Sequence, residues 1–434
     1  MAPDQVDQLE IRPINRPVDA EIQVPGSKSI TNRALLLAAL ADGTSTLENA
    51  LFSEDSHWCA ECLRRLGIAI EEDEPAERFT IHGLNGVLPA TSADLFVGNS
   101  GTTARFITAA ATLGHGEYNF DGVARMRQRP IGNLLKALRP LGANFTSDND
   151  CFPLTVHANG LRGGATELDA TESSQLLSAL LQVAAYAEND VTINVTGTVV
   201  SVPYIDITLK MMAQFGIAPD NHYYRNYSIK ASQRYRAQRY IVEPDASNAT
   251  YFFAAAALTK GRVRVPHLSP DSLQGDAHFV DVLEQMGCTV TRADDYLEVQ
   301  GPDRLKGIEI DLNAMSDTAQ TLAAIAPFAS SPVTIRNVEH MRHKETDRIN
   351  AIVTELRKLG VRVDEFPDGV TIYPAYPSAV QAAAIDTYND HRMAMAFSVI
   401  GLVVPGIRIN DPGCTRKTFP DFFARFEKLY DLSL

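Results

Sequence analysis

Cationic and acidic side chains that could bind and transform a small anion gather in a few short polar motifs of this sequence. The cations are Lys28 and Arg33 in PGSKSITNR, Arg105 in GTTAR, Arg125, Arg127 and Arg129 in ARMRQRP, Lys344 and Arg348 in HKETDR, Arg392 in YNDHR, and Lys417 in TRKTFP. Asp317 and Glu345, which could transfer protons, accompany them. Forked guanidinium groups suit phosphate and carboxylate oxygens. Because the chain's net charge is −14, an anionic substrate needs such a local cationic pocket.

Each motif also has a plain structural interpretation. A Ser, Asn or Asp at a helix start is usually a cap, and KETDR alone would be read as a helix opening with solvent-exposed ion pairs. ARMRQRP alone could be a solvated loop. The functional interpretation rests on their coincidence with a repeat that places the motifs at equivalent points of the chain.

Six polar clusters each precede a helix that is apolar on nearly every face. They begin at Ser29, Ser100, Ser173, Ser247, Ser316 and Asp390, at intervals of 71, 73, 74, 69 and 74 residues. A period this long indicates six copies of one supersecondary unit. Each start presents unpaired backbone N–H groups and a positive dipole end, which favour anions.

A second marker has the same period. Amphipathic helices end at five glycines, which we expect to adopt left-handed caps, namely Gly67, Gly142, Gly216, Gly287 and Gly360. After each cap comes an alternating strand, at 79–82, 154–157, 227–230, 297–300 and 370–373. Alternation gives each sheet one wet and one buried face.

Helices that are apolar all round must lie inside, so the half-wet sheets must lie outside. The sequence therefore predicts an α/β fold of inside-out barrels. A (β/α)8 barrel, with about 250 residues for eight units, would need a repeat of only ~30 residues. The observed period excludes it.

Six repeats divide naturally into two domains of three, which also suits a chain of 434 residues. We place the first domain at 27–238 and a discontinuous second domain at 1–26 plus 239–434. The last repeat lacks strands after its helix, whereas 9–26 is strand-like, so we expect the N-terminal strands to complete that repeat. We expect the cations of the two halves to face each other across an interdomain cleft, which would be the active site.

Composition excludes several classes of protein. The chain is 45% apolar and 21% charged, with no apolar run of transmembrane length and no evident signal peptide. Its net negative charge disfavours nucleic acid and anionic membranes as partners. Five scattered cysteines indicate reduced thiols in a cytoplasm. Cys59 and Cys62 could suggest a metal site with His57, but no second ligand pair follows, so buried thiols are favoured. GSKS lacks the spacing of a nucleotide phosphate loop.

Eight segments resemble, in order, the signature segments of the enolpyruvyl transferases. They are PGSKSITNRALLLAALA, GNSGTTAR, RMRQRPIG, SSQLLSALL, SVPYIDITL, HKETDRI, TYNDHRMAMAFS and TRKTFPDF. The resemblance runs essentially end to end and implies two domains of three βαβαββ repeats. It also implies transfer of the enolpyruvyl group of phosphoenolpyruvate to the 5-hydroxyl of shikimate 3-phosphate through a tetrahedral intermediate. Neither a metal nor an organic cofactor is implied.

The resemblance also assigns roles to individual residues. Asp317 resembles the base for the 5-hydroxyl proton, and Glu345, assisted by Lys28, resembles the acid that protonates the methylene carbon. The implied contacts of shikimate 3-phosphate are Lys28, Ser29, Arg33, Ser173, Ser174, Gln175, Ser201, Tyr204, Asp317 and Lys344. Those of phosphoenolpyruvate are Lys28, Asn99, Gly101, Arg125, Gln175, Arg348, Arg392 and Lys417.

The chain departs from the family pattern at three positions. Ser100 stands where GNAGT is usual, His340 where a substrate-binding asparagine is found, and Ser316 where proline is common. Gly101 leaves room for glyphosate, so we expect inhibition by that compound. A monomer is expected.

Two other functions compete with this interpretation. A related transferase uses UDP-N-acetylglucosamine, but it carries a loop cysteine that GVARMRQRPIG lacks. A noncatalytic anion-binding protein would be expected to lose Lys28, Asp317, Glu345 or Lys417, all of which are present.

Overall fold

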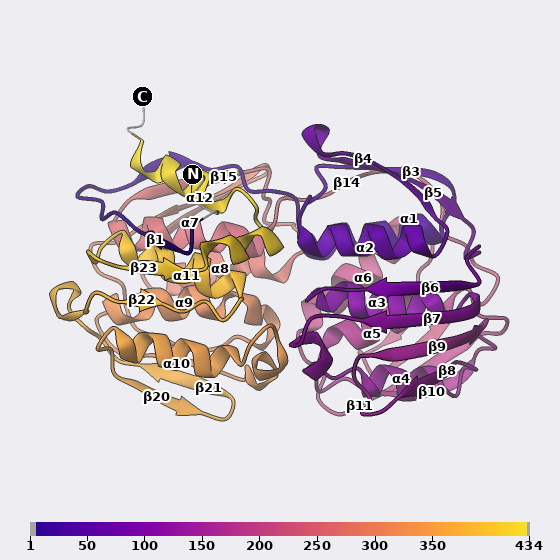
Figure 1. Ribbon diagram of the computed structural model, residues 1–434. Helices are drawn as coiled ribbons and strands as arrows, with labels where there is room; N and C mark the ends of the chain where they lie inside the picture. Colours follow the sequence, from indigo (N-terminus) through magenta and orange to yellow (C-terminus); the bar gives the residue numbers. More distant parts are fainter. Residues whose placement is uncertain (1–5, 432–434) are drawn as a thin grey trace. The chain divides into compact units, whose positions relative to one another are not determined.

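The computed structural model describes residues 6–431, which form two compact units. The continuous unit is Gly26–Val242, and the split unit combines the chain up to Pro25 with the chain from Glu243 onward. The chain passes between the units at Pro25–Gly26 and at Val242–Glu243. Figure 1 colours the continuous unit from indigo to magenta, whereas most of the split unit runs from orange to yellow.

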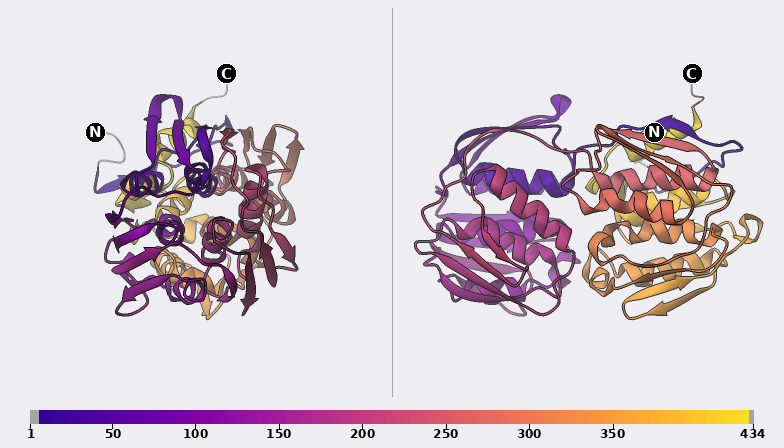
Figure 2. Two further views of the ribbon diagram at one scale, coloured as in Figure 1. Left: turned by 90° about the vertical axis from the view of Figure 1, so that its right-hand side faces the viewer. Right: turned by 180° about the vertical axis from the view of Figure 1, so that it is seen from behind.

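The continuous unit has three nearly fully buried helices at its centre: α1 (Lys28–Leu40), α3 (Gly101–Ala111) and α5 (Ser174–Ala184). Every residue of α3 is buried, as the all-round apolar sequence predicts. Three amphipathic helices accompany them: α2 (Glu54–Arg65), α4 (Gly132–Leu138) and α6 (Val202–Gln214). In the left view of Figure 2 several helices of this unit are seen end-on with strands outside them.

Three four-stranded sheets surround these helices. Their strands are β3 (Asp42–Glu48), β4 (Ala69–Asp73), β5 (Arg78–Leu84) and β14 (Arg239–Ile241); β6 (Ser92–Phe96), β7 (His115–Asp121), β8 (Asn144–Ser147) and β9 (Leu154–Asn159); and β10 (Gly164–Asp169), β11 (Val191–Thr196), β12 (Asp220–His222) and β13 (Asn226–Ile229). Each sheet has the same pairing. In the second sheet, β6 pairs in parallel with β7, β7 pairs antiparallel with β9, and β9 pairs antiparallel with β8. A repeated pairing pattern is what repeated sequence units should produce.

The split unit repeats this plan. Its central helices are α7 (Ala246–Thr259), α9 (Ala319–Ile325) and α11 (His391–Gly401), and the others are α8 (Phe279–Gln285), α10 (Arg348–Lys358) and α12 (Phe422–Glu427). Its four-stranded sheets contain β2 (Asp19–Glu21), β15 (Arg262–Pro266), β16 (Thr289–Ala293) and β17 (Tyr296–Gln300), and β18 (Glu309–Asp311), β19 (Val333–Arg336), β20 (Val363–Phe366) and β21 (Gly369–Ile372). The third has only three described strands, β1 (Gln8–Glu10), β23 (Arg408–Asn410) and β22 (Ala384–Ile385). The predicted architecture, with helices inside and sheets outside, is confirmed.

The N-terminal strands are shared between two repeats of the split unit. β1 pairs antiparallel with β23 and completes the last repeat, as expected. β2 instead pairs in parallel with β15, in the fourth repeat. The prediction that both strands complete the last repeat is therefore wrong for β2, because Val263 rather than a residue of β23 supplies the partner of Ala20.

The helix starts are displaced from some predicted caps. Ser100, Ser173 and Asp390 are the N-caps of α3, α5 and α11, as expected. Ser27 and Asp245 precede α1 and α7 in extended conformation, so Ser29 and Ser247 lie in the first turns instead. Ser316 lies in the 3₁₀ turn Asn313–Thr318 that precedes α9, directly after Met315, whose backbone is non-helical. All five predicted cap glycines have positive φ, from 76° to 109°, and the five predicted strands are present.

Candidate functional site

Asp317 lies at the centre of a group of cations in the split unit. Its Oδ2 accepts a hydrogen bond from Nη2 of Arg392 at 2.7 Å, and its Oδ1 accepts one from Nη1 of Arg348 at 3.0 Å. Nζ of Lys344 lies 3.6 Å from the same Oδ1. Asp317 comes just before α9, Arg348 begins α10 and Arg392 is in the first turn of α11, so the starts of three helices bring the group together. Asp317 and its two arginines are buried, which strengthens these charge interactions.

Arg348 joins three carboxylates. Besides Asp317, its guanidinium donates to Oε2 of Glu345 at 2.8 Å and to Oδ2 of Asp390 at 2.7 Å. Burial opposes the charge of Arg348, but the carboxylates of Asp390, Glu345 and Asp317 raise its pKa above the ordinary value. Arg348 is therefore a permanent cation that fixes the two predicted proton-transfer groups relative to each other.

Glu345 has a second cation near its other oxygen. Nζ of Lys417 lies 3.9 Å from Oε1, and both side chains are buried. Lys417 ends a 3₁₀ turn, Pro412–Lys417, that follows β23. The split unit thus brings Asp317, Lys344, Glu345, Arg348, Arg392 and Lys417 into one connected cluster of carboxylates and cations.

In the continuous unit, the start of α5 offers polar groups to an anion. Ser173 is the N-cap, and its hydroxyl accepts a hydrogen bond from N–H of Gln175 at 3.2 Å. Ser174 and Gln175 form the first turn of α5. The N-terminal end of an eleven-residue helix favours a negative charge.

Arg33 ties three helices of the same unit together. From α1 its guanidinium donates to the Thr208 hydroxyl of α6 at 2.7 Å and to the Ser178 hydroxyl of α5 at 3.3 Å. It also donates to the carbonyl of Tyr204 at 3.0 Å. Burial lowers the pKa of Arg33 to about 10, against the opposing charge of Tyr204, so it stays protonated at neutral pH. The structure therefore gives Arg33 contacts that position Tyr204, and a direct contact with substrate stays a prediction.

Lys28 and Ser201 are at two other helix starts. Lys28 is the first residue of α1, and its Nζ lies 3.6 Å from Oδ2 of buried Asp55. Ser201 precedes α6 in the left-handed conformation (φ 53°, ψ 49°), and its carbonyl accepts a hydrogen bond from N–H of Tyr204 at 3.0 Å. Left-handed backbone is costly for a residue with a side chain and is concentrated at functional positions.

The remaining predicted residues of the continuous unit are at the start of α3 and in the loop that carries Arg125. Gly101 is the first residue of α3, and Asn99 precedes its cap. Arg125 is half-buried and donates to Oε1 of Gln128 at 3.4 Å. A Cβ atom added to Gly101 would lie 3.0 Å from Oε1 of Gln175, so the starts of α3 and α5 approach closely at this glycine.

The chain matches the family model described as EPSP synthase (3-phosphoshikimate 1-carboxyvinyltransferase) over residues 13–426. The chain belongs to the EPSP synthase family. It is 58% identical over 428 residues to the 3-phosphoshikimate 1-carboxyvinyltransferase of Nostoc punctiforme, covering 98% of this chain and 100% of the relative. The enzyme of the same name from Shewanella denitrificans is 48% identical, covering 97% and 99%. The structure of EPSP synthase from Acinetobacter baumannii superposes with a TM-score of 0.82 at 25% identity, covering 98% of both chains.

Two departures from the family pattern are bonded to each other. Nε2 of His340 lies 2.9 Å from the hydroxyl of Ser316, the residue that precedes Asp317. Burial and the charge of Lys344 lower the pKa of His340 to about 3, so its ring is neutral at physiological pH. Ser316 thus provides a hydroxyl that pairs with this histidine.

The third departure faces inward. The Ser100 hydroxyl lies 2.7 Å from the hydroxyl of Thr103 and caps α3 through N–H of Thr103 at 3.4 Å. The Ser100 side chain is buried, so it serves the helix start.

Sequence reasoning gave no site role to two buried carboxylates. Asp390 bonds Arg348, although the sequence marked it only as a helix cap. Asp276 accepts a hydrogen bond from Ser247, and burial together with the charge of Asp317 raises its pKa to about 6. Its sequence, LQGDAH, carries no period or spacing that would have indicated this position.

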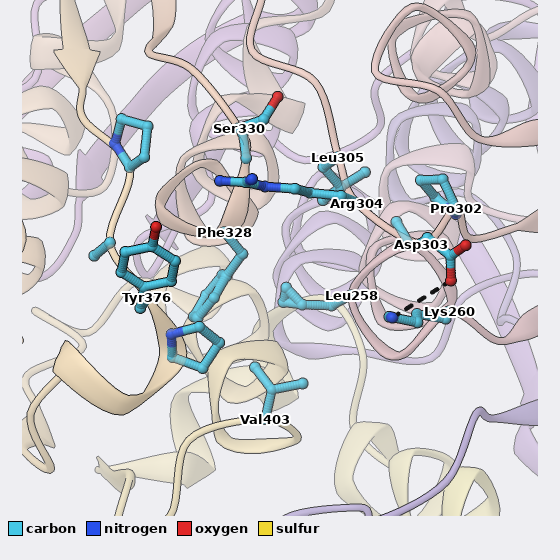
Figure 3. A pocket seen from close by; sticks show the side chains of 15 residues that line it. Leu258, Lys260, Pro302, Asp303, Arg304, Leu305, Phe328, Ser330, Tyr376 and Val403 are labelled. Atoms are coloured by element: carbon cyan, nitrogen blue, oxygen red, sulfur yellow. Dashed lines mark hydrogen bonds and ion pairs between the residues drawn. The ribbon is translucent and has the colours of Figure 1, made fainter.

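A cavity of about 400 Å³ in the split unit contains none of these residues. It lies at the C-terminal ends of the inner helices, lined by Leu258 and Lys260 at the end of α7, Phe328, and Val403 after α11. Figure 3 shows Arg304 extending across it and Lys260 paired with Asp303 at 3.4 Å. Cations at helix C-termini offset the negative dipole end, which explains this pair without a substrate.

The described part of the chain has neither a metal-ligating cluster nor a membrane span. Within residues 6–431 no group of three or more His, Cys, Asp and Glu side chains could hold a metal ion. Cys59 and Cys62 are buried, and burial raises the pKa of both thiols. No helix in the same range is long and apolar enough to span a membrane.

Proposed function

We propose that this chain transfers the enolpyruvyl group of phosphoenolpyruvate to the 5-hydroxyl of shikimate 3-phosphate and releases phosphate. The observation that carries the proposal is the placement of two buried carboxylates, Asp317 and Glu345, on one guanidinium, that of Arg348. Family membership and relatives at 58% and 48% identity support the same reaction.

The two carboxylates suit an addition followed by an elimination. In the addition, Asp317 takes the proton of the 5-hydroxyl while the 5-oxygen of the acceptor forms a bond to C2 of the donor. Glu345 gives a proton to C3 of the donor. In the elimination, Glu345 takes a proton back from C3, the C2–O bond to phosphate breaks, and Asp317 returns a proton to the departing phosphate. Protons and electron pairs then balance, and no oxidant is needed.

Arg392 and Arg348 are proposed to bind the anionic groups of the donor with Lys417. Both arginines bond Asp317 in this structure. Donor anions compete for these guanidinium groups. Their arrival should draw the arginines away from Asp317, which frees the Asp317 oxygens for the acceptor hydroxyl.

The continuous unit is proposed to bind shikimate 3-phosphate. Ser173, Ser174 and Gln175 at the start of α5 would receive the phosphate, and Tyr204, positioned by Arg33, would contact the sugar-like ring. We propose that Lys28, Asn99, Gly101 and Arg125 complete the donor site. We propose that both clusters act on the same pair of substrates.

Phosphate release tests the proposal. Purified protein is incubated with phosphoenolpyruvate and either shikimate 3-phosphate or UDP-N-acetylglucosamine, and only the first acceptor should give turnover. Asp317→Asn and Glu345→Gln should each lower kcat at least about 100-fold, the scale of general acid–base catalysis, with smaller effects on KM. Turnover with the nucleotide sugar, or near-normal kcat in both variants, would contradict the proposal.

Three further properties are proposed with the function. Glyphosate should compete with phosphoenolpyruvate, because Gly101 has no side chain, and an inhibition constant in the millimolar range or weaker would refute this. The five unpaired thiols support a cytoplasmic location. A monomer is proposed, which sedimentation velocity tests directly.

A further inference from the structure

Two buried arginines outside the assigned donor residues hold the start of α3 against the loop that carries Arg125. Arg129 donates from Nη1 to the carbonyl of Asn99 at 3.0 Å. Arg105 donates from Nη2 to the carbonyl of Pro130 at 2.6 Å and from Nη1 to the carbonyl of Gly101 at 3.4 Å. Only 3% of each arginine is exposed, so these are interior contacts of the continuous unit.

Arg129 also occupies the space where Gly101 would carry a side chain. A Cβ atom built on Gly101 would lie 2.4 Å from Nη2 of Arg129 and 3.0 Å from its Cζ. Carbon and nitrogen atoms that are not bonded do not approach so closely. An alanine at 101 must therefore displace the guanidinium, and this movement would disturb its bond to Asn99.

Three residues assigned to the donor lie close to one point beside the Arg129 guanidinium. Asn99 accepts its hydrogen bond, Gly101 faces its Nη2, and Oε1 of Gln175 lies 3.0 Å from the same built Cβ position. Arg125, the assigned donor cation of this loop, precedes Arg129 by four residues. Arg129 therefore lies where the assigned donor residues of this unit come close together.

We propose that Arg129 is a positioning residue of the donor site, whose guanidinium fixes the Asn99–Gly101 turn and makes glycine necessary at position 101. The inference rests on the proposed function and deepens it. It also explains glycine at position 101 by a contact within the protein. This explanation is separate from the space that the donor or an inhibitor needs. Arg129 acts through the turn and is given no direct role in bond making.

A double-mutant cycle between positions 101 and 129 tests this. Arg129→Gln should raise KM for phosphoenolpyruvate about tenfold, or about 1.4 kcal/mol, by releasing the turn. KM for shikimate 3-phosphate should change less than about twofold, a split that a general loss of structure would not give. Gly101→Ala should raise KM for phosphoenolpyruvate about tenfold in the parent enzyme. In the Arg129→Gln background, where the clashing group is absent, the same change should add less than about twofold.

Arg127→Gln is the matched control. Arg127 lies two residues away in the same loop, is exposed, and pairs with Asp121 at 2.8 and 2.6 Å. It should leave both KM values within about twofold of the parent and should not couple to Gly101→Ala. If Arg129→Gln fails to fold, Arg129→Lys carries the cycle, since lysine also removes Nη2.

The inference would be overturned if Gly101→Ala raised KM for phosphoenolpyruvate by the same factor in both backgrounds. It would also be overturned if Arg129→Gln raised the KM values of both substrates equally. Failure of the proposed function is a different result, because it requires that the parent enzyme release no phosphate from phosphoenolpyruvate and shikimate 3-phosphate. With turnover in the parent established, the coupling reports on Arg129 alone.

Discussion

Replacing Asp276 by asparagine should stabilise the protein at alkaline pH. Asp276 is buried in the 3₁₀ turn Gly275–His278 and accepts a hydrogen bond from the Ser247 hydroxyl, which an asparagine carbonyl can also accept. Burial, together with the charge of Asp317, raises the pKa of Asp276 from 3.8 to about 6. The folded protein therefore binds this proton more tightly than the unfolded chain does.

The pH dependence follows from that direction. As the pH rises from 3.8 to about 6, the unfolded chain has already lost the proton that the folded protein still holds, so the free energy of unfolding falls. A shift of about two pKa units corresponds to at most about 3 kcal/mol at pH 8. The neutral amide of the Asp276→Asn variant would carry no such cost, and the gain should shrink to about 1 kcal/mol at pH 4.5.

Urea unfolding followed by far-ultraviolet circular dichroism at pH 8 and pH 4.5 measures this difference. The only tryptophan, Trp58, lies in the continuous unit, so its fluorescence would report on the wrong part of the chain. Asp281→Asn is the control. Burial opposes its charge, but hydrogen bonds from Arg292 and His278 lower the pKa of Asp281, so its loss should not stabilise at pH 8. An Asp276→Asn protein no more stable than the parent at pH 8 would refute the reasoning.

Three further predictions concern other features. Arg348→Met should lower the free energy of unfolding by about 3–5 kcal/mol, because it leaves three buried carboxylates without their common partner. The control Arg357→Met removes an exposed side chain and should change this free energy little. Similar urea midpoints for the two variants would contradict the prediction. Ser100→Ala should cost about 1 kcal/mol as a lost helix cap while KM for phosphoenolpyruvate stays within about twofold. A large change in that KM in either direction would show that the hydroxyl reaches the donor. Of the five thiols, only half-buried Cys151 should react with Ellman's reagent in the native protein, and Cys151→Ser should abolish the reaction.

The repeat was predictable because each copy carries its own local signals. A glycine at 67, 142, 216, 287 or 360 ends a helix for reasons that involve only neighbouring residues, and all five adopt positive φ. The helix starts were less certain where two polar residues compete. In PGSKS both Ser27 and Ser29 could cap, and the extended backbone of Ser27 decides the outcome.

Contacts within the site could not be predicted in the same way. The bond between Asp317 and Arg392 joins residues 75 apart, and that between Arg33 and Thr208 joins residues 175 apart. Resemblance to a family indicates which residues matter. It does not show that the guanidinium of Arg33 donates its hydrogen bonds to neighbouring helices. Nor does it show that His340 and Ser316, two separate departures, are partners.

The pairing of Leu9 with Ile409 has a consequence for biosynthesis. The residues of the continuous unit emerge from the ribosome as one uninterrupted stretch, so that unit can fold as soon as it is complete. β1 is made before the continuous unit but must wait for a partner synthesised 400 residues later. At about 5–20 residues per second this delay is roughly 20–80 s.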